Sequence, residues 1–291
     1  MRPLPLTLVV NADDLGLSAS VNRGIEHAFR AGLVRSASLM PNGAAWEDAL
    51  AVAARCPGLG VGVHLSLVGE SALTAPAEIP GLASPDGLLP ASYGDFMKRL
   101  LTGRFGAAQV EIEIRAQVGK CLAAGLHPTH LDSHQHLHAW PALLAIVQRV
   151  AAEYEIPVIR MPAERGGPGG HAGPARRGQV RLLSLLASRG ARRVRGAGLR
   201  CADHFWGTGV SGALDETALR GILERLRPGV NELMCHPGYR DEWTGARYQW
   251  GYEWETELAA LTSPRARELV ASRGIRLANF AEAWEESGAR G

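Results

Sequence analysis

Strand-like and helix-like stretches alternate along the whole sequence, and this alternation predicts an α/β fold with a mostly parallel sheet. Polar side chains follow several of the strand-like stretches, as they do in a TIM-like (β/α) barrel, where active sites draw on several strand ends. No Gly-rich phosphate loop follows any predicted strand, which disfavours a doubly wound nucleotide-binding sheet. We therefore predict an irregular TIM-like barrel with seven or eight strands.

The first predicted strand is the apolar run at residues 6–11. We interpret it as a core strand and not as a signal segment, because no small-residue cleavage site follows it. The later strand-like segments are short and are separated by stretches with helical periodicity. The predicted strands are residues 6–11, 36–40, 59–64, 129–132, 156–160, 203–206, 231–236 and 275–279.

The helix-like segments carry apolar residues at helical spacing. In residues 18–31, Ile25 and Ala28 share one face, and Gly32 is a stop signal. A Pro/Gly-rich stretch at residues 70–90 is too long for a plain connector, so we expect it to line a binding cleft. The predicted helices are residues 18–31, 46–54, 105–124, a helix from 141, 181–189, 215–226 and 254–272.

Length and composition indicate one soluble domain. The chain has 291 residues and no Ser/Gly-rich linker, so a single domain over residues 1–291 is expected. A net charge of +2 gives no global reason to expect nucleic-acid binding. Cys56, Cys121, Cys201 and Cys235 form no CxxC pair, which favours a reduced, cytoplasmic protein. No apolar run approaches the roughly 18 residues that a membrane span needs.

Four of the ten histidines fall within nine residues, which indicates a metal site because histidine is the commonest side-chain metal ligand. His130 and His134 have the spacing of one helical turn. His134, His136 and His138 have the spacing of one face of an extended segment. The four cannot all bind one metal, so some are expected to contact substrate or to support a ligand, as Asp132 would.

Two adjacent carboxylates, Asp13 and Asp14, directly follow the first predicted strand. In a regular strand they would point to opposite faces, so both face one cleft only if the chain turns there, and Gly16 favours such a turn. One carboxylate would then bind metal while the other acts as a base. A catalytic divalent ion takes about three nitrogen or oxygen ligands, and Asp14, His64 and His134 from separate strands are the predicted set.

His236 follows another strand-like run, in the segment CHPG. We predict that it is a general acid opposite the metal, with a buried structural histidine as the alternative. An aromatic-rich segment comes next, and sugar stacking and core packing explain it equally well. Its aromatic residues are Tyr239, Trp243, Tyr248, Trp250, Tyr252 and Trp254.

Further polar residues are predicted at or just past the C-terminal ends of strands, where barrel active sites lie. The predicted substrate contacts among them are Arg160, His130, His136 and Asp203. Residues 165–202 contain nine arginines and no acidic residue. An amphipathic helix with a solvated basic face accounts for this stretch, and an anion-binding or partner-binding role is the alternative.

Seven motifs resemble those of the YdjC-type carbohydrate deacetylases, a family with chito-oligosaccharide deacetylases and a hopanoid-biosynthesis-associated branch. In chain order they are NADDLG from Asn11, GVHL from Gly62, THLDSH from Thr129, IRMP from Ile159, DHFWG from Asp203, CHPG from Cys235 and ELAALTS from Glu257. The resemblance spans about residues 6–280. It implies a TIM-like barrel, often a homodimer, with one divalent metal ion (zinc, magnesium or another transition metal) that hydrolyses N-acetyl groups on amino sugars.

The resemblance also implies a role for each matched residue. Asp13 is the base, Asp14, His64 and His134 are the metal ligands, and His236 is the acid. The implied substrate is an N-acetylglucosamine-type saccharide or a glycolipid. The segment PAEIP at residues 76–80 looks like the hopanoid-associated branch, whereas CHPGY at 235–239 looks like the chito-oligosaccharide branch.

Two rival functions fit parts of the sequence. A barrel phosphoesterase or amidohydrolase would carry an HxH motif after its first strand, but this chain carries Asp13 and Asp14 there. A non-enzymatic protein would bind nucleic acid or a regulatory partner through residues 165–202. Loss of Asp13 or of a metal ligand would favour that second rival, and all of these residues are present.

Overall fold

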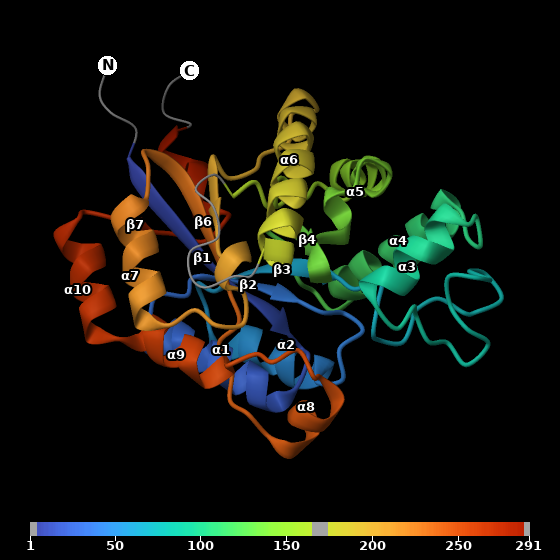
Figure 1. Cartoon of the computed structure of the whole chain (residues 1–291), viewed down its shortest axis with the longest axis horizontal. Coiled ribbons are helices and arrows are strands. Elements are labelled where there is room, and N and C mark those ends of the chain that lie inside the picture. The colour runs from blue at the N-terminus through green and yellow to red at the C-terminus, as the bar shows by residue number, and fades with distance from the viewer. Residues whose placement is uncertain (1–4, 165–173, 288–291) are drawn as a thin grey trace.

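The computed structural model describes residues 5–164 and 174–287, and helices surround a central parallel sheet (Figure 1). The strands are β1 (Leu6–Leu15), β2 (Ser36–Leu39), β3 (Gly60–Leu65), β4 (Leu131–Ser133), β5 (His204–Trp206), β6 (Gly229–Cys235) and β7 (Arg276–Leu277). The helices are α1 (Ala19–Ala31), α2 (Trp46–Arg55), α3 (Tyr93–Leu101), α4 (Ala107–Ala123), α5 (Pro141–Glu153), α6 (Pro174–Gly196), α7 (Glu216–Arg225), α8 (Glu242–Arg247), α9 (Trp254–Thr262) and α10 (Pro264–Ser272).

The sheet has the order β4-β3-β2-β1-β6-β5, and every pairing in it is parallel. Strand β7 pairs with β1 at Thr7 and Leu8, below the point where β2 begins to pair with β1 at Asn11. Parallel strands carry all their C-terminal ends to one edge of the sheet. The segments that leave the strands therefore meet at that edge.

The predicted α/β class is confirmed, and the six or seven parallel strands form a half-barrel consistent with the predicted TIM-like barrel. The predicted fifth strand at 156–160 is not a regular strand. It makes isolated bridges from Ile159 to β4 and from Val158 to Arg200. Pro157 and Pro162 interrupt this segment, and proline cannot donate to a strand ladder.

Local sequence signals explain where several helices begin and end. The Ser18 hydroxyl accepts a hydrogen bond from the Val21 amide and caps α1. The predicted helix at 254–272 is two helices, α9 and α10, because Pro264 has no amide hydrogen to continue the first one. Pro264 instead occupies the first position of α10, where its fixed backbone angle is favourable.

Three parts of the chain differ from the predicted elements. The short helices α3 and α8 were not predicted, and α6 is longer than the predicted helix at 181–189. The Pro/Gly-rich stretch at 70–90 forms an irregular loop that projects beside α3 (Figure 1). The buried Glu113 carboxylate of α4 fixes this loop by accepting hydrogen bonds from two of its backbone amides. Among the described residues, no helix combines the length and apolar character of a membrane span.

Candidate metal and active site

The chain turns at Asp14, which allows two consecutive carboxylates to serve one site. Asp14 has a positive φ of 67°, and the register of β1 against β2 shifts between Ala12 and Leu15. Aspartate is among the few residues with a side chain that tolerate this left-handed conformation. The turn predicted from the sequence is therefore present, and it begins at Asp14, two residues before Gly16, whose own φ is 97°.

Asp14, His64 and His134 converge at the C-terminal ends of β1, β3 and β4. The Asp14 Oδ1 atom lies 3.4 Å from His64 Nε2 and 3.1 Å from His134 Nδ1. One ligand atom from each residue lies within 4.8 Å of the others, and all three side chains are buried. One carboxylate and two imidazoles are a donor set that borderline divalent metals bind.

Two further observations fit a cation at this place. Asp14 Oδ2 is buried and has no hydrogen-bond partner among the described residues. Burial would raise the pKa of Asp14, but His134 and His64 hold it well below its ordinary value, so the carboxylate is charged. A buried, charged oxygen without a partner is costly unless a positive group compensates for it. The predicted ligands thus fit a divalent ion.

His64 is oriented by the neighbouring carboxylate of Asp132. Its Nδ1 atom lies 2.8 Å from Asp132 Oδ1, which leaves Nε2 directed towards Asp14. Burial opposes protonation, but the charge and hydrogen bond of Asp132 raise the pKa of His64 to about 10. Carboxylate–histidine pairs of this kind fix the ring and increase its basicity as a metal ligand. The sequence interpretation of Asp132 as a supporting residue agrees with this geometry.

Arg160 lies beneath the site and binds Asp13. Its two terminal nitrogens donate to the two Asp13 oxygens at 2.6 and 2.7 Å. It also forms ion pairs with Asp132 and Glu232, each at 2.5 Å. The Arg160 side chain is fully buried, and it is not among the residues that line the cavity. Its position indicates an orienting role towards Asp13 instead of the predicted contact with substrate.

Arg160, Asp13, Asp132 and Glu232 form a buried charge cluster, and among its carboxylates Glu232 of β6 has the fewest hydrogen-bond partners. Its Oε1 atom accepts a hydrogen bond from Arg160 Nε at 2.5 Å, whereas Oε2 has no partner among the described residues. Burial raises the pKa of Glu232 to about 7, and the charges of Asp132 and Asp13 add to the rise. Near neutral pH, Glu232 is therefore divided between charged and uncharged forms.

His236 lies on the opposite side of the site and is positioned by Glu257 of α9. The His236 amide donates to Glu257 Oε2 at 2.5 Å, and the Nδ1 atom lies 3.8 Å from the same oxygen. Burial would lower the pKa of His236, but Glu257 and then Asp14 and Asp13 raise it above the ordinary value. A histidine with a raised pKa keeps its proton to higher pH, as a general acid requires.

Helix α1 and the loop after His236 touch through their backbones. A Cβ atom added at Gly24 would lie 2.3 Å from the Cα atom of Gly238. The Tyr239 amide donates to the Ser20 carbonyl at 3.2 Å, which joins the same two segments. Helix α1 begins soon after the two carboxylates at the end of β1. The base and acid candidates therefore belong to segments that are packed directly on each other.

The histidine cluster divides into cavity-lining and structural members. His134 and His136 line the cavity, and His136 has a positive φ of 55° and a buried Nδ1 atom without a partner among the described residues. His138 Nε2 donates to the Arg160 carbonyl, and its Nδ1 atom accepts from the Ser133 hydroxyl. Burial lowers the pKa of His138 to about 4, so this ring is neutral at pH 7.

Two predicted substrate contacts lie at the wrong end of their strands. His130 precedes β4 and is fully buried, with Nε2 2.9 Å from Ser38 Oγ and its ring against Phe280. Asp203 precedes β5, is half exposed, and accepts a hydrogen bond from the Val230 amide. Neither residue is among those that line the cavity. Their predicted placement at C-terminal strand ends is wrong, because each residue directly precedes the first residue of its strand.

A cavity of about 610 Å³ opens above these groups. Asp13, His64, His134 and His236 line its polar side, and Trp250 and Tyr252 of the predicted aromatic segment line it as well. The Trp250 ring is centred 5.0 Å from the His134 ring. Helix α6 forms another wall, which is mostly apolar. Its residues are Gln179, Val180, Leu182, Leu183 and Leu186.

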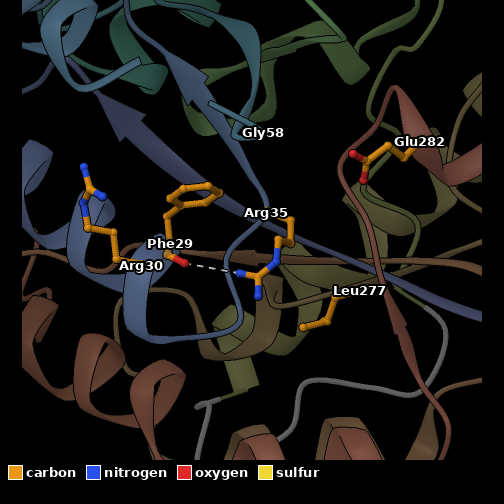
Figure 2. A pocket seen from close by; sticks show the side chains of 6 residues that line it. All are labelled: Phe29, Arg30, Arg35, Gly58, Leu277 and Glu282. Atoms are coloured by element: carbon orange, nitrogen blue, oxygen red, sulfur yellow. Dashed lines mark hydrogen bonds between the residues drawn. The ribbon is translucent and has the colours of Figure 1, made fainter. Parts of the chain in front are cut away.

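A second hollow, of about 590 Å³, lies at the N-terminal ends of the strands (Figure 2). Arg35 is the cation nearest its centre, but its Nη1 atom donates to the carbonyls of Phe29, Gly32 and Val34. Glu282 contributes a carboxylate to the lining of this hollow. These side chains form no group with metal-ligand spacing, so the hollow has the size but not the chemistry of the first cavity.

Several supporting residues were not predicted from the sequence. They are Asn11, Ser38, Glu232 and Glu257. Asn11 Nδ2 donates to Asp13 Oδ1 at 2.8 Å, and Ser38 Oγ donates to Asp132 Oδ2 at 2.8 Å. A charged residue within an apolar strand, as at Glu232, was the one available signal, since buried charges are rare without a partner.

Comparison with known proteins agrees with this site. A family model described as YdjC-like protein matches residues 7–272, and the chain belongs to this family. A protein of Brevibacillus brevis named carbohydrate deacetylase is 35% identical over 279 residues, which cover 95% of this chain and 99% of that protein. The human carbohydrate deacetylase is 33% identical, with 94% and 89% covered. The chitooligosaccharide deacetylase of Yersinia pestis is 32% identical, with 94% and 97% covered.

A solved structure also shares the fold. The crystal structure of a putative cellobiose-phosphate cleavage protein from Enterococcus faecalis superimposes with a TM-score of 0.76 at 23% sequence identity. The match covers 95% of this chain and 98% of that protein. The architecture is therefore common to both proteins, and the resemblance to the YdjC-type family noted from the sequence motifs is confirmed.

Proposed function

We propose that this protein is a metal-dependent carbohydrate N-deacetylase. The observation that carries the proposal is the convergence of Asp14, His64 and His134 beside one cavity that Asp13 and His236 also line. The names of the relatives support a carbohydrate substrate and loss of an acetyl group. A bound divalent ion would polarise the acetyl carbonyl and make water a better nucleophile.

The residues around this ion divide the proton transfers between them. The two hydrogen bonds from Arg160 orient the Asp13 carboxyl group, which accepts the proton of the attacking water. His236, whose pKa is raised by Glu257 against the effect of burial, donates to the leaving amine, which departs poorly unless it is protonated. The Asp13 and His236 roles match those that the family resemblance implies.

The cavity supports an N-acetylglucosamine-type saccharide or a glycolipid as substrate. Trp250 and Tyr252 offer aromatic rings to a sugar, and His136 lines the same cavity. The donor set does not select among zinc, magnesium and other divalent ions, since such ligands serve several metals. Homodimer formation and a cytoplasmic location remain predictions from the sequence.

The proposal is tested by measuring free acetate and free phosphate from a panel of substrates, together with bound metal. We expect acetate from N-acetylated saccharides or sugar lipids, no phosphate from phosphoesters, and about one divalent ion per chain. Chelation should remove activity, and added metal should restore it. Phosphate release without acetate would support the phosphoesterase rival and overturn the deacetylase proposal.

The non-enzymatic rival is tested on the same preparation. A protein that binds nucleic acid through the arginine-rich stretch would show strongly salt-dependent binding and no acetate release. Helix α6 forms part of the cavity that Asp13, His64, His134 and His236 also line, and this placement favours an enzymatic function over the non-enzymatic one.

A further inference from the structure

Helix α6 carries an apolar surface from inside the cavity to the outside of the molecule. Leu183 and Leu186 line the cavity and are partly buried. Leu182 lines the cavity and is also 54% exposed, and Leu185, three residues further along the helix, is 50% exposed. Residues three apart on a helix are neighbours on its surface. The apolar wall therefore continues past the cavity mouth and onto the surface.

Exposed arginines extend the same helix surface. Arg189 is four residues after Leu185, and Arg192 is three residues after Arg189, so these side chains follow one face. Arg193 is exposed beside them. In the part of the chain that the structure describes, no carboxylate lies within ion-pair distance of these three arginines. The sequence from 165 to 202 contains no acidic residue at all.

We propose that this surface, called the α6 face (Leu182, Leu185, Arg189, Arg192 and Arg193), docks on an anionic lipid bilayer. Leucines beside uncompensated arginines are the pattern of a helix that lies in a membrane interface, with apolar side chains inserted and cations at the phosphates. Charge complementarity favours this occupant over a second copy of the chain. A symmetric dimer through the α6 face would bring two sets of the same arginines together.

The position of Leu182 gives docking a consequence for the site. Because Leu182 belongs both to the cavity wall and to the α6 face, a bilayer on this face would lie against the cavity mouth. A sugar carried on a membrane lipid would then reach His64 and His134 without leaving the surface. This consequence rests on the proposed deacetylase function, whereas docking itself does not.

The test is sedimentation of the full-length protein with lipid vesicles. We expect it to bind vesicles that contain phosphatidylglycerol in preference to pure phosphatidylcholine, and to bind less at high salt. Leu185→Gln should weaken partitioning by about tenfold, as expected when a leucine side chain that would be buried in the bilayer is lost. Arg189→Gln should weaken it by about fivefold, since each basic residue near an anionic surface is worth about 1 kcal/mol. Glutamine is a good helix former, so both variants should retain α6.

Matched controls lie on other surfaces. Leu101→Gln changes a leucine of α3 that is 79% exposed, and Arg265→Gln changes an arginine of α10 whose side chain is 85% exposed. Both control variants should partition like the wild type. Equal losses in the control and α6 variants, or no preference for anionic vesicles, would overturn the docking proposal.

Two further readouts separate docking from its rivals. If sedimentation equilibrium shows a dimer that Leu185→Gln dissociates, a second copy covers the α6 face and the proposal is wrong. Acetate release from a free N-acetylated sugar should be unchanged in Leu185→Gln, because this residue does not line the cavity. If docking succeeds while no variant releases acetate from any substrate, the deacetylase proposal fails and the docking proposal survives.

Discussion

The two ends of the parallel sheet carry hollows of nearly equal size but of different chemistry. The hollow at the N-terminal end measures about 590 Å³ and the one at the C-terminal end about 610 Å³. At the first, the Arg35 Nη1 atom donates to three backbone carbonyls. At the second, Asp14 Oδ2 and His136 Nδ1 are buried and lack partners among the described residues. Unmet bonding capacity, and not volume, marks the candidate site.

This difference arises from how a parallel sheet is built. The strands bring their C-terminal ends together, and the loops that leave those ends are free to place polar groups around one point. The segments entering the sheet at the other end instead satisfy their polar groups locally. Asp203 illustrates this, because it accepts the Val230 amide and pairs with Arg195 at 3.5 Å.

The largest expected effect comes from exchanging a carboxylate at each end. Asp14→Asn should abolish both metal binding and activity, because it removes the charged metal ligand that lies beside His64 and His134. Asparagine tolerates the positive φ at this position, so the fold should persist. Asp203→Asn at the opposite end should leave both quantities near the wild-type level. Elemental analysis measures bound metal and acetate release measures activity in both variants. A large loss of activity in Asp203→Asn would restore the predicted substrate role of Asp203.

Asp13→Asn should separate proton transfer from metal binding. Groups that transfer protons contribute about 10²–10⁴-fold, so kcat should fall by that order while bound metal stays near one ion per chain. Asparagine retains one acceptor for Arg160, which limits structural change. Loss of metal in Asp13→Asn together with retention in Asp14→Asn would mean that the two carboxylates exchange roles.

Glu232→Gln should change how stability depends on pH. The folded-state pKa of Glu232 is about 7, above its ordinary value of 4.5. Between pH 4.5 and pH 7 the folded protein binds more protons than the unfolded chain. The contribution of Glu232 to the free energy of unfolding is therefore full below pH 4.5 and is lost as pH rises to 7. The stability of the wild type relative to Glu232→Gln should therefore fall by about 3 kcal/mol across that range. Urea denaturation of both proteins at several pH values measures it, and parallel curves would refute the raised pKa.

The smallest expected effect concerns the acid candidate. Glu257 raises the pKa of His236, so activity that needs a protonated His236 should persist to higher pH. Glu257→Gln removes this negative charge and should shift the high-pH limb of the kcat profile to lower pH. Glu255→Gln on the exposed side of α9 is the control, and its profile should match the wild type. An unchanged limb in Glu257→Gln would make His236 a structural residue.

The sequence was informative where function depends on residues at the C-terminal end of a strand. Asp14, His64 and His134 each lie at or directly after the end of a strand, and the structure brings them together. Arg160 was also located correctly at the end of its segment. Its contacts with Asp13 and Glu232 could not be predicted, because they depend on which residues face inward across the sheet.

Errors arose where the chain offers weak periodicity. Strands β4 and β5 have three residues each, and their observed first residues lie two and one residues after the predicted ones, so that His130 and Asp203 precede the strands. The segment at 156–160 has strand composition, but its two flanking prolines limit it to isolated bridges. These isolated bridges are long-range pairings, which residue patterns do not encode.

The contact between Gly24 and Gly238 limits how this site can diverge. No side chain fits between α1 and the loop after His236, so a substitution at Gly24 would push this loop away from the helix. The walls built from α6 and from the aromatic segment have no such restriction. New substrate preferences within this architecture would therefore arise by remodelling those walls, while the close packing of α1 on the loop that follows the acid candidate is retained.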